Sequence, residues 1–199
     1  MDDSPRTSWL YWFGRFLFMI IFDLVYRRRV IGSANIPGEG GVIIASNHAS
    51  LADPPLVGSS ISRPLYFMAK RELFGVPVLG FLIRRTNAFP VKRGARDTAA
   101  FRSALRVLDD GKSLLVFPEG TRSKDGGFGK AKPGLGMLAC LARVPVVPVR
   151  LINSNNLSKL APITVIIGKP LTPPNGRDRA SYQRFSEQVL EAIKQLKET

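Results

Sequence analysis

Short runs of apolar residues alternate with amphipathic segments along most of the chain, and glycine, proline or polar residues separate them. Short apolar runs that are rich in Val, Ile, Leu and Phe are typical of strands. They predict strands at Gly41–Ala45, Leu65–Ala69, Ala88–Val91, Ser113–Phe117, Val146–Ile152 and Ile163–Ile167. Helical spacing or a small, apolar composition predicts helices at Pro54–Ser60, Ala95–Asp110, Pro133–Ala142 and Arg179–Lys197. This alternation is typical of an α/β fold, with a mixed, largely parallel sheet flanked by helices.

The first 30 residues follow a different pattern, a nearly continuous apolar run from Trp9 to Tyr26 that ends in three arginines, Arg27–Arg29. Eight of the 18 aromatic residues lie there, and aromatic rings and basic side chains both favour the headgroup layer of a membrane. The run is shorter than the usual ~20 residues of a membrane span and contains two charges, each costing about 3 kcal/mol near a bilayer centre. We therefore expect residues 1–30 to form a membrane-interface helical segment and residues 31–199 to form the α/β domain. The alternative is a helix packed on the protein's own core.

The charge balance narrows the choice of partners. The chain carries 29 lysines and arginines against 15 aspartates and glutamates, a net charge of +14, which favours nucleic acid, anionic lipid or phosphorylated small molecules. Nucleic acid is disfavoured, because the aromatic residues gather at the N-terminus and are not interleaved with the basic ones as a stacking platform requires. A single cysteine, Cys140, and a single histidine, His48, exclude a disulfide scaffold, a cysteine zinc cluster and a multi-histidine metal site. We expect neither a metal nor a bound cofactor.

Residues that can carry chemistry gather in two loops that follow predicted strands. The first loop spans residues 46–54, and the second spans residues 117–123. In α/β sheets the functional residues lie at the carboxyl ends of strands, where two such loops can share one crevice. A third segment, residues 87–94, lies between the two loops in the sequence and contains two adjacent basic residues, Lys92 and Arg93.

These segments resemble the glycerolipid acyltransferase family, and within it the bacterial type of 1-acylglycerol-3-phosphate acyltransferase. Residues 47–53 fit the family pattern NHxSxxD, residues 89–93 fit its Phe-to-Arg block, and residues 117–123 fit its FPEGTRS block. A fourth block, a valine-proline strand, is similar to residues 144–149. The blocks follow one another in the family's order, and the N-terminal membrane helix lies where the family has one. The resemblance implies that residues 31–199 form an acyltransferase domain.

Acyl transfer to an alcohol requires a base, because a hydroxyl is a weak nucleophile until its proton is removed. His48 is the single histidine of the sequence, and imidazole, with an ordinary pKa of about 6.5, accepts a proton at neutral pH. Asp53 would hold the ring in the right tautomer and stabilise the imidazolium. The alternatives are that His48 is a structural histidine at a strand end and that Asp53 is only the N-cap of the helix before Pro54. Asn47 and Ser50 complete the motif around this pair.

Phosphate recognition requires fixed cations. Arg93 and Arg122 are the candidates for the acceptor's phosphate, with Lys92 as a helper, because a guanidinium binds phosphate oxygens bidentately. The resemblance implies a role of Glu119 in acceptor binding, at the glycerol portion or in positioning Arg122. Gly120 is expected to permit a tight turn and to expose backbone N–H groups to an anion. The candidate acceptor-binding residues are therefore Lys92, Arg93, Glu119, Gly120, Thr121 and Arg122.

The resemblance implies an O-acyltransferase that moves a fatty acyl group from acyl-CoA or acyl carrier protein to the sn-2 hydroxyl of lysophosphatidic acid, giving phosphatidic acid. Its partners would be membrane lipids and these substrates, and it would act as a peripheral or monotopic protein at the cytoplasmic face of the cell membrane. Glycerol 3-phosphate or a lyso-aminolipid is an alternative acceptor for the same chemistry. The alternative outside the enzymes is a basic lipid-binding or nucleic-acid-binding protein.

Overall fold

The computed structural model describes residues 7–92, 97–123, 127–176 and 178–198. Its centre is a seven-stranded sheet with the strand order β1-β7-β6-β2-β5-β3-β4. The strands are β1 (Arg29–Ile31), β2 (Val42–Ser46), β3 (Leu65–Lys70), β4 (Ala88–Val91), β5 (Ser113–Val116), β6 (Val146–Ile152) and β7 (Thr164–Ile167). Neighbouring strands are parallel except β6 and β7, which are antiparallel. The prediction of a mixed, largely parallel sheet is therefore confirmed.

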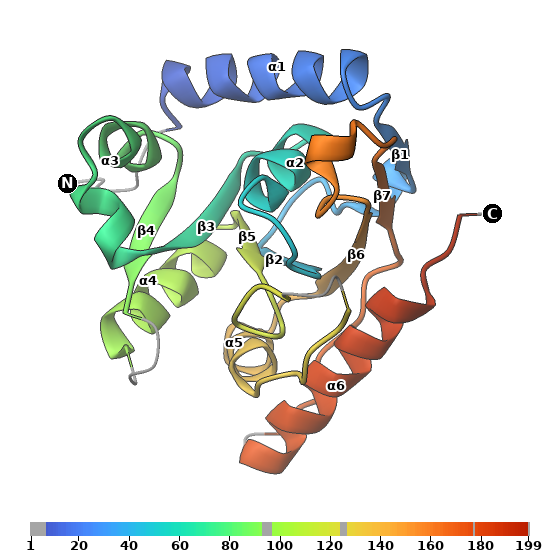
Figure 1. The fold of residues 1–199 in the computed structure, drawn as a ribbon. Coiled ribbons are helices and arrows are strands. Elements are labelled where there is room, and N and C mark those ends of the chain that lie inside the picture. The colour runs from blue at the N-terminus through green and yellow to red at the C-terminus, as the bar shows by residue number, and fades with distance from the viewer. Residues whose placement is uncertain (1–6, 93–96, 124–126, 177, 199) are drawn as a thin grey trace.

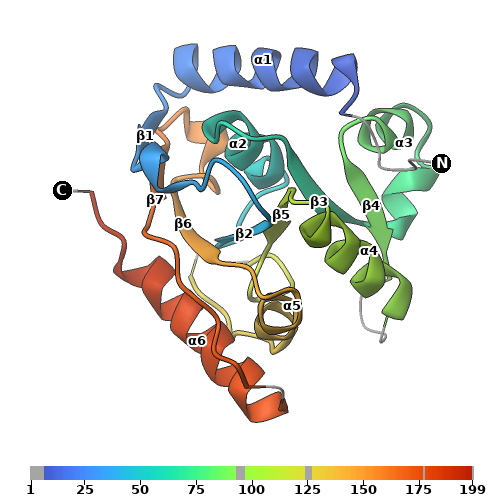
Figure 2. The same ribbon diagram turned by 180° about the vertical axis from the view of Figure 1, so that it is seen from behind.

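Helices cover both faces of this sheet (Figure 1). They are α1 (Trp9–Leu24), α2 (Asp53–Ser60), α3 (Pro77–Arg84), α4 (Thr98–Asp109), α5 (Gly134–Ala142) and α6 (Arg179–Gln195). Short 3-10 helices cover Ser33–Asn35, Arg71–Gly75 and Leu157–Lys159. α1 and α2 pack on one face, and α4, α5 and α6 pack on the other (Figure 2). α3 lies beside β4, at the edge of the sheet.

The central strand β2 illustrates how the sequence produces the two layers. Successive side chains of a strand point to opposite faces of its sheet. Ile43 and Ala45 accordingly belong to the core under α4, α5 and α6, whereas Val42 and Ile44 belong to the core under α1 and α2. Because both faces are buried, the strand has a continuous apolar sequence without alternation.

Two elements of the structure lie outside the sequence-based prediction, β1 and α3. β1 has only three residues, too few for a periodic pattern, and it joins the sheet by pairing with β7. α3 is an apolar run of only eight residues, and a run of that length does not by itself separate a helix from a strand.

The boundaries of α4 also differ from the expected range, Ala95–Asp110, of which residues 95 and 96 lie outside the described part. In the structure α4 begins at Thr98, because Asp97 is its N-cap and accepts a hydrogen bond from the Ala100 N–H at 3.0 Å. It ends just before Gly111, whose φ of 70° stops a right-handed helix.

Helix α1 has a packed face and an exposed face. Tyr11 and Phe22 are buried, and Arg15 donates hydrogen bonds to the carbonyls of Gly58 and Ile61, at the C-terminal end of α2. Its opposite face carries large exposed side chains at helical spacing: Trp9, Phe13, Phe16, Ile20 and Leu24. The helix thus packs on the domain and also presents an apolar surface. None of the helices in the described residues is both long and apolar enough to cross a bilayer.

Candidate active site

Two adjacent parallel strands carry the two candidate loops. In the register of β2 and β5, Ala45 lies opposite Val116, so the loops after both strands leave the same edge of the sheet. The Ser123 N–H donates a hydrogen bond to the His48 carbonyl oxygen at 2.8 Å, which joins the two loops directly. The expectation that they share one crevice is therefore confirmed.

His48 and Asp53 form a buried pair in the first loop. His48 Nδ1 lies 2.8 Å from Asp53 Oδ2, and the exposed fractions of the two residues are 5% and 0%. The same Oδ2 atom accepts hydrogen bonds from the backbone N–H groups of Ala49, at 2.7 Å, and Ser50, at 2.8 Å. Because this carboxylate accepts from Nδ1, the neutral imidazole carries its proton on Nδ1 and presents the lone pair of Nε2.

The N-cap interpretation of Asp53 is wrong. The N-cap of α2 is Ala52, which makes no side-chain capping hydrogen bond, and Asp53 is the first residue of the helix. Its carboxylate is directed back to His48 and to the backbone of the loop that precedes the helix. One carboxylate therefore both orients the imidazole and fixes the turn that carries it.

Phe117, the first residue after β5, fixes the plane of the imidazole ring. Its ring stacks on that of His48 with centroids 3.8 Å apart and an interplanar angle of 11°. The hydrogen bonds among the described residues leave His48 Nε2 without a protein partner. A histidine held by a carboxylate on one nitrogen and free on the other can act as a general base toward a hydroxyl.

Asn47 and Ser50 support the loop from within the protein. The Asn47 side chain exchanges two hydrogen bonds with the backbone of Leu151, accepting from its N–H at 2.8 Å and donating to its carbonyl at 3.0 Å. This contact ties the end of β2 to β6. Ser50 Oγ accepts a hydrogen bond from the Ala52 N–H at 3.2 Å. Both residues position the loop that carries the His48–Asp53 pair.

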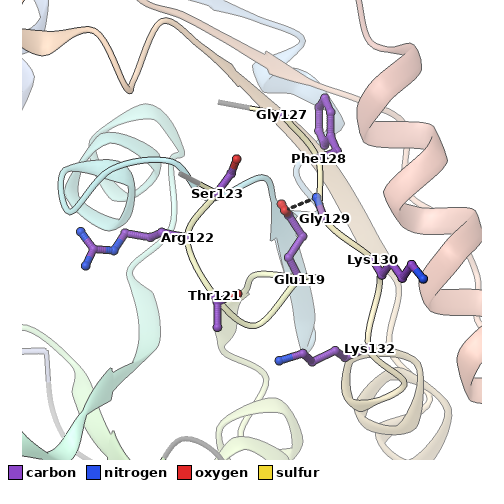
Figure 3. A pocket seen from close by; sticks show the side chains of 9 residues that line it. All are labelled: Glu119, Thr121, Arg122, Ser123, Gly127, Phe128, Gly129, Lys130 and Lys132. Atoms are coloured by element: carbon purple, nitrogen blue, oxygen red, sulfur yellow. Dashed lines mark hydrogen bonds between the residues drawn. The ribbon is translucent and has the colours of Figure 1, made fainter. Parts of the chain in front are cut away.

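The second loop borders a polar cavity of about 420 Å³. Glu119 is buried beside it, and its Oε2 atom accepts a hydrogen bond from the Gly129 N–H at 2.6 Å (Figure 3). Its other oxygen, Oε1, is buried and has no hydrogen-bond partner in the described part of the chain. A carboxylate oxygen in this state can accept a hydrogen bond from a ligand hydroxyl. The residues that line the cavity are Glu119, Thr121, Arg122, Ser123, Gly127, Phe128, Gly129, Lys130 and Lys132.

Two details of the second loop differ from the expectations. Gly120 does permit the tight turn, with a φ of 72°, but its own N–H donates to the Phe117 carbonyl at 2.9 Å, so that this group does not face an anion. Glu119 does not position Arg122: in Figure 3 the Arg122 side chain points away from it, and no ion pair joins these two described residues.

Lys132 is a cation near the second loop that the sequence patterns do not single out. The position that a Cβ atom would take at Gly120 lies 3.1 Å from Lys132 Nζ, so the lysine side chain covers the turn. In Figure 3 Lys132 extends toward Thr121, whereas Lys130 points to the opposite side. In the sequence, the signal that could have indicated Lys132 is its position shortly after the FPEGTRS block. The contact of Lys132 with the turn at Gly120 depends on how the chain folds back onto that turn.

The basic residues expected from the third segment lie apart from the two loops or outside the described residues. Lys92 follows β4 at the edge of the sheet, where its backbone N–H donates to Asp97 Oδ2 at 2.7 Å, and it lines neither cavity described here. Arg93 lies outside the described residues. Arg122 lines both cavities, and its guanidinium makes no hydrogen bond or ion pair with the described residues.

An apolar cavity of about 500 Å³ opens beside His48. Its walls come from α1, α2, β3, α3 and the segment between β3 and α3, and His48, Phe117 and Arg122 lie at one part of it. A volume in the range of roughly 300–1,000 Å³ is typical of ligand sites. The combination of a free imidazole nitrogen, an apolar cavity and Arg122, a cation without an ion-pair partner among the described residues, is typical of an enzyme whose substrate has an apolar chain and an anionic head.

Comparison with known proteins places the chain in a family. The family model described as Acyltransferase matches residues 27–152, more than half of the sequence. The chain therefore belongs to the acyltransferase family, and the resemblance found in its motifs is confirmed.

Several characterised relatives are similar over most of the chain. The 1-acyl-sn-glycerol-3-phosphate acyltransferase of Bacillus subtilis is 27% identical over 184 residues, which cover 89% of this chain and 92% of that protein. The lyso-ornithine lipid O-acyltransferase of Pseudomonas aeruginosa is 32% identical over 144 residues, which cover 72% of this chain and 52% of that protein. The chain thus spans nearly all of one relative and about half of the other.

A solved structure has the same fold. The crystal structure of the 1-acyl-sn-glycerophosphate acyltransferase PlsC from Thermotoga maritima aligns with a TM-score of 0.71 and 30% sequence identity. The alignment covers 96% of this chain and 80% of that chain. The chain therefore resembles this acyltransferase over nearly its whole fold, and not only in its motifs.

Proposed function

We propose that the protein transfers a fatty acyl group from a thioester carrier, acyl-CoA or acyl carrier protein, to the sn-2 hydroxyl of lysophosphatidic acid. The observation that carries this proposal is the buried His48–Asp53 pair, whose imidazole lines an apolar cavity that also reaches Arg122. The names of the Bacillus subtilis and Thermotoga maritima relatives support the choice of acceptor. The product is phosphatidic acid.

In the proposed reaction the acceptor hydroxyl attacks the thioester carbonyl directly. His48 Nε2 takes the hydroxyl proton as the new C–O bond forms, and Asp53 stabilises the resulting imidazolium through Nδ1. The C–S bond then breaks, and the imidazolium returns the proton to the departing thiolate. No acyl-enzyme forms, because the substrate hydroxyl takes the part that a serine has in hydrolases.

The surroundings of His48 suggest how the acceptor lies. The apolar cavity accommodates acyl chain, and Arg122, at the boundary of the two cavities, binds the phosphate together with Lys132. The unpartnered Oε1 atom of Glu119 accepts a hydrogen bond from a glycerol hydroxyl. Arg93 and Lys92 remain further candidates for phosphate contacts, from the motif alone.

A second acceptor is favoured by one specific observation, the similarity to a lyso-ornithine lipid O-acyltransferase. Both acceptors present a hydroxyl and an acyl chain, but only lysophosphatidic acid carries a phosphate monoester. A panel of purified acceptors decides between them: lysophosphatidic acid, glycerol 3-phosphate and lyso-ornithine lipid, each with acyl-CoA and with acyl carrier protein. We expect the highest kcat/KM for lysophosphatidic acid. A higher value for lyso-ornithine lipid would replace the proposed acceptor while retaining the chemistry.

Phosphate binding predicts a specific kinetic effect at Arg122 and Lys132. Arg122→Ala and Lys132→Ala should each raise the KM for lysophosphatidic acid by about 10- to 100-fold, because a charge-assisted contact contributes roughly 1.5–3 kcal/mol. The KM for the acyl donor should change much less. Lys169→Ala is the matched control, since Lys169 is exposed and lines neither cavity; Lys130, whose side chain points away from the turn (Figure 3), is not used because it lines the polar cavity. Equal changes in both KM values would mean that these cations serve the fold or the donor.

We also propose that the protein acts as a peripheral membrane protein whose α1 lies in the interface at the cytoplasmic face. The exposed stripe of α1 supplies apolar area, and the exposed Arg27 and Arg29 at its end supply attraction to anionic headgroups. The polar groups within α1 do not oppose this arrangement. Arg15 is turned toward α2, and Asp23 pairs with Arg28 at 2.9 Å.

Substitutions on the exposed stripe test this contact. Replacing Trp9, Phe13 and Phe16 by serine should abolish co-sedimentation with anionic vesicles, because interfacial binding scales with the apolar area that enters the lipid. Activity on lysolipid in detergent micelles should persist, since Tyr11 and Phe22 still pack α1 on the domain. The control is Leu141→Ser, at an exposed apolar residue of α5. Unchanged co-sedimentation of the triple variant would mean that α1 is not the main contact.

A further inference from the structure

Helix α3 exposes an unusual amount of apolar surface for its length. Val78 is 73% exposed, Phe81 is 53% exposed, and Val76, which precedes the helix, is 46% exposed. Gly80 is the single buried residue of its eight. Isolated apolar residues are common on protein surfaces, but a contiguous group of this kind marks a contact with another apolar phase.

The position of α3 relates this surface to the apolar cavity. Leu79, Leu82 and Ile83 of α3 line one side of the cavity, and Phe18 of α1 lines another. Figures 1 and 2, which view the molecule from opposite sides, both show α1 and α3 at the same end of it. Two helices with exposed apolar surfaces therefore border one apolar cavity.

Cations accompany the apolar surface of α3. The Arg84 guanidinium lies 5.5 Å from the centre of the Phe74 ring and donates to the Phe74 carbonyl at 2.7 Å, while the Arg85 guanidinium lies 4.8 Å from the Phe81 ring. Apolar side chains with adjacent cations complement the acyl and headgroup layers of an anionic membrane. A second copy of the chain matches this surface less well than a membrane does, because a symmetric contact through α3 would place Arg84 and Arg85 of one copy against the same residues of the other.

We propose that α3 is a second membrane-contacting element, which enters an anionic phospholipid bilayer beside α1. The apolar cavity would then face the acyl chains between two inserted helices, so that an acyl chain passes from the bilayer to His48 without crossing water. This inference rests on the proposed function, since it concerns the route of a lipid substrate to that site. It extends the membrane contact from the N-terminal helix to an element on the far side of the cavity.

A fluorophore attached to α3 tests the contact directly. The label is placed at the exposed position 78 in a full-length Val78→Cys variant that also carries Cys140→Ala, which removes the single native cysteine. We expect the emission of an environment-sensitive label to shift to the blue on addition of phosphatidylglycerol vesicles, and to shift less with phosphatidylcholine vesicles. The matched control carries the label at Leu141→Cys on α5, across the sheet from α1, and should not shift.

A double substitution supplies the functional measurement. Val78→Glu with Phe81→Glu should lower the rate on lysophosphatidic acid embedded in phosphatidylglycerol vesicles by about tenfold or more, because carboxylates do not enter the acyl layer. The rate on the same lysolipid in detergent micelles should stay close to that of the unmodified protein. This difference separates a lost membrane contact from a damaged fold.

Other outcomes overturn the inference about α3 without affecting the proposed function. A label at position 78 that stays in water while the protein binds vesicles and transfers acyl groups would remove α3 from the membrane contact. A shift that depends on protein concentration in the absence of vesicles would assign the surface to a second copy of the chain. Absence of acyl transfer in micelles would instead contradict the proposed function, whatever the label reports.

Discussion

His48→Ala should lower the rate of acyl transfer by at least about 10²-fold, because general-base catalysis typically contributes 10²–10⁴-fold and the sequence has no second histidine. Among the described residues, His48 supplies the imidazole nitrogen that lies beside the apolar cavity without a protein partner. Steady-state kinetics in detergent micelles with lysophosphatidic acid measure the loss. The KM for both substrates should change little, because the apolar cavity and the cations remain.

Chemical rescue distinguishes catalysis from a structural role of His48. The substitution leaves a slot beside the Phe117 ring, which stacks on the native imidazole at a centroid distance of 3.8 Å. Added imidazole should enter this slot and restore part of the activity of the His48→Ala variant. A folded variant that retains nearly the activity of the unmodified protein would contradict the role of His48 as the base.

Asp53→Asn should reduce kcat by about 10²- to 10⁴-fold while leaving the KM values nearly unchanged, in analogy with the loss of the orienting aspartate from a serine-protease triad. Asp53 is fully buried and lines neither cavity, so it does not touch the substrate and acts through His48. An asparagine cannot stabilise an imidazolium and can force the wrong tautomer of the ring. A kcat close to that of the unmodified protein would mean that Asp53 only organises the loop.

The same substitution should also lower the thermal unfolding temperature. Asp53 Oδ2 accepts two backbone hydrogen bonds besides that of His48, and a charge-assisted hydrogen bond contributes roughly 1.5–3 kcal/mol. Kinetics should therefore be measured well below that temperature, with circular dichroism as the control for folding. A lower kcat with unchanged KM values then reports a loss of catalysis and not a loss of folding.

Most strands of the fold could be predicted from the sequence because each is a short apolar run that glycine, proline or polar residues bound. β4 and β6 begin and end where expected, β3, β5 and β7 differ from their expected ranges by one residue at one end, and β2 differs by one residue at each end. The strand and the α-helix that the patterns miss are both short. β1 is too short for a pattern, and α3 combines apolar residues on most of its surface with a position at the edge of the sheet.

The candidate site was predictable where neighbouring residues act together. The His48–Asp53 contact lies within one loop, so the motif alone suggested it, although local propensity could not separate an orienting carboxylate from an N-cap. The stacking of Phe117 on His48 and the approach of Lys132 to Gly120 depend on how distant segments meet. No spacing in the sequence encodes such contacts. The contribution of Arg93 stays a prediction from its motif.

Direct acyl transfer to lysophosphatidic acid can be tested by the stoichiometry of the products. Purified protein is incubated with acyl-CoA and lysophosphatidic acid in detergent, and free thiol and phosphatidic acid are quantified together while mass spectrometry follows the intact protein. We expect one phosphatidic acid for each thiol released, no thiol release above background without the acceptor, and no acylated protein. Thiol release without phosphatidic acid, or an acyl group that resides on the protein, would contradict direct transfer.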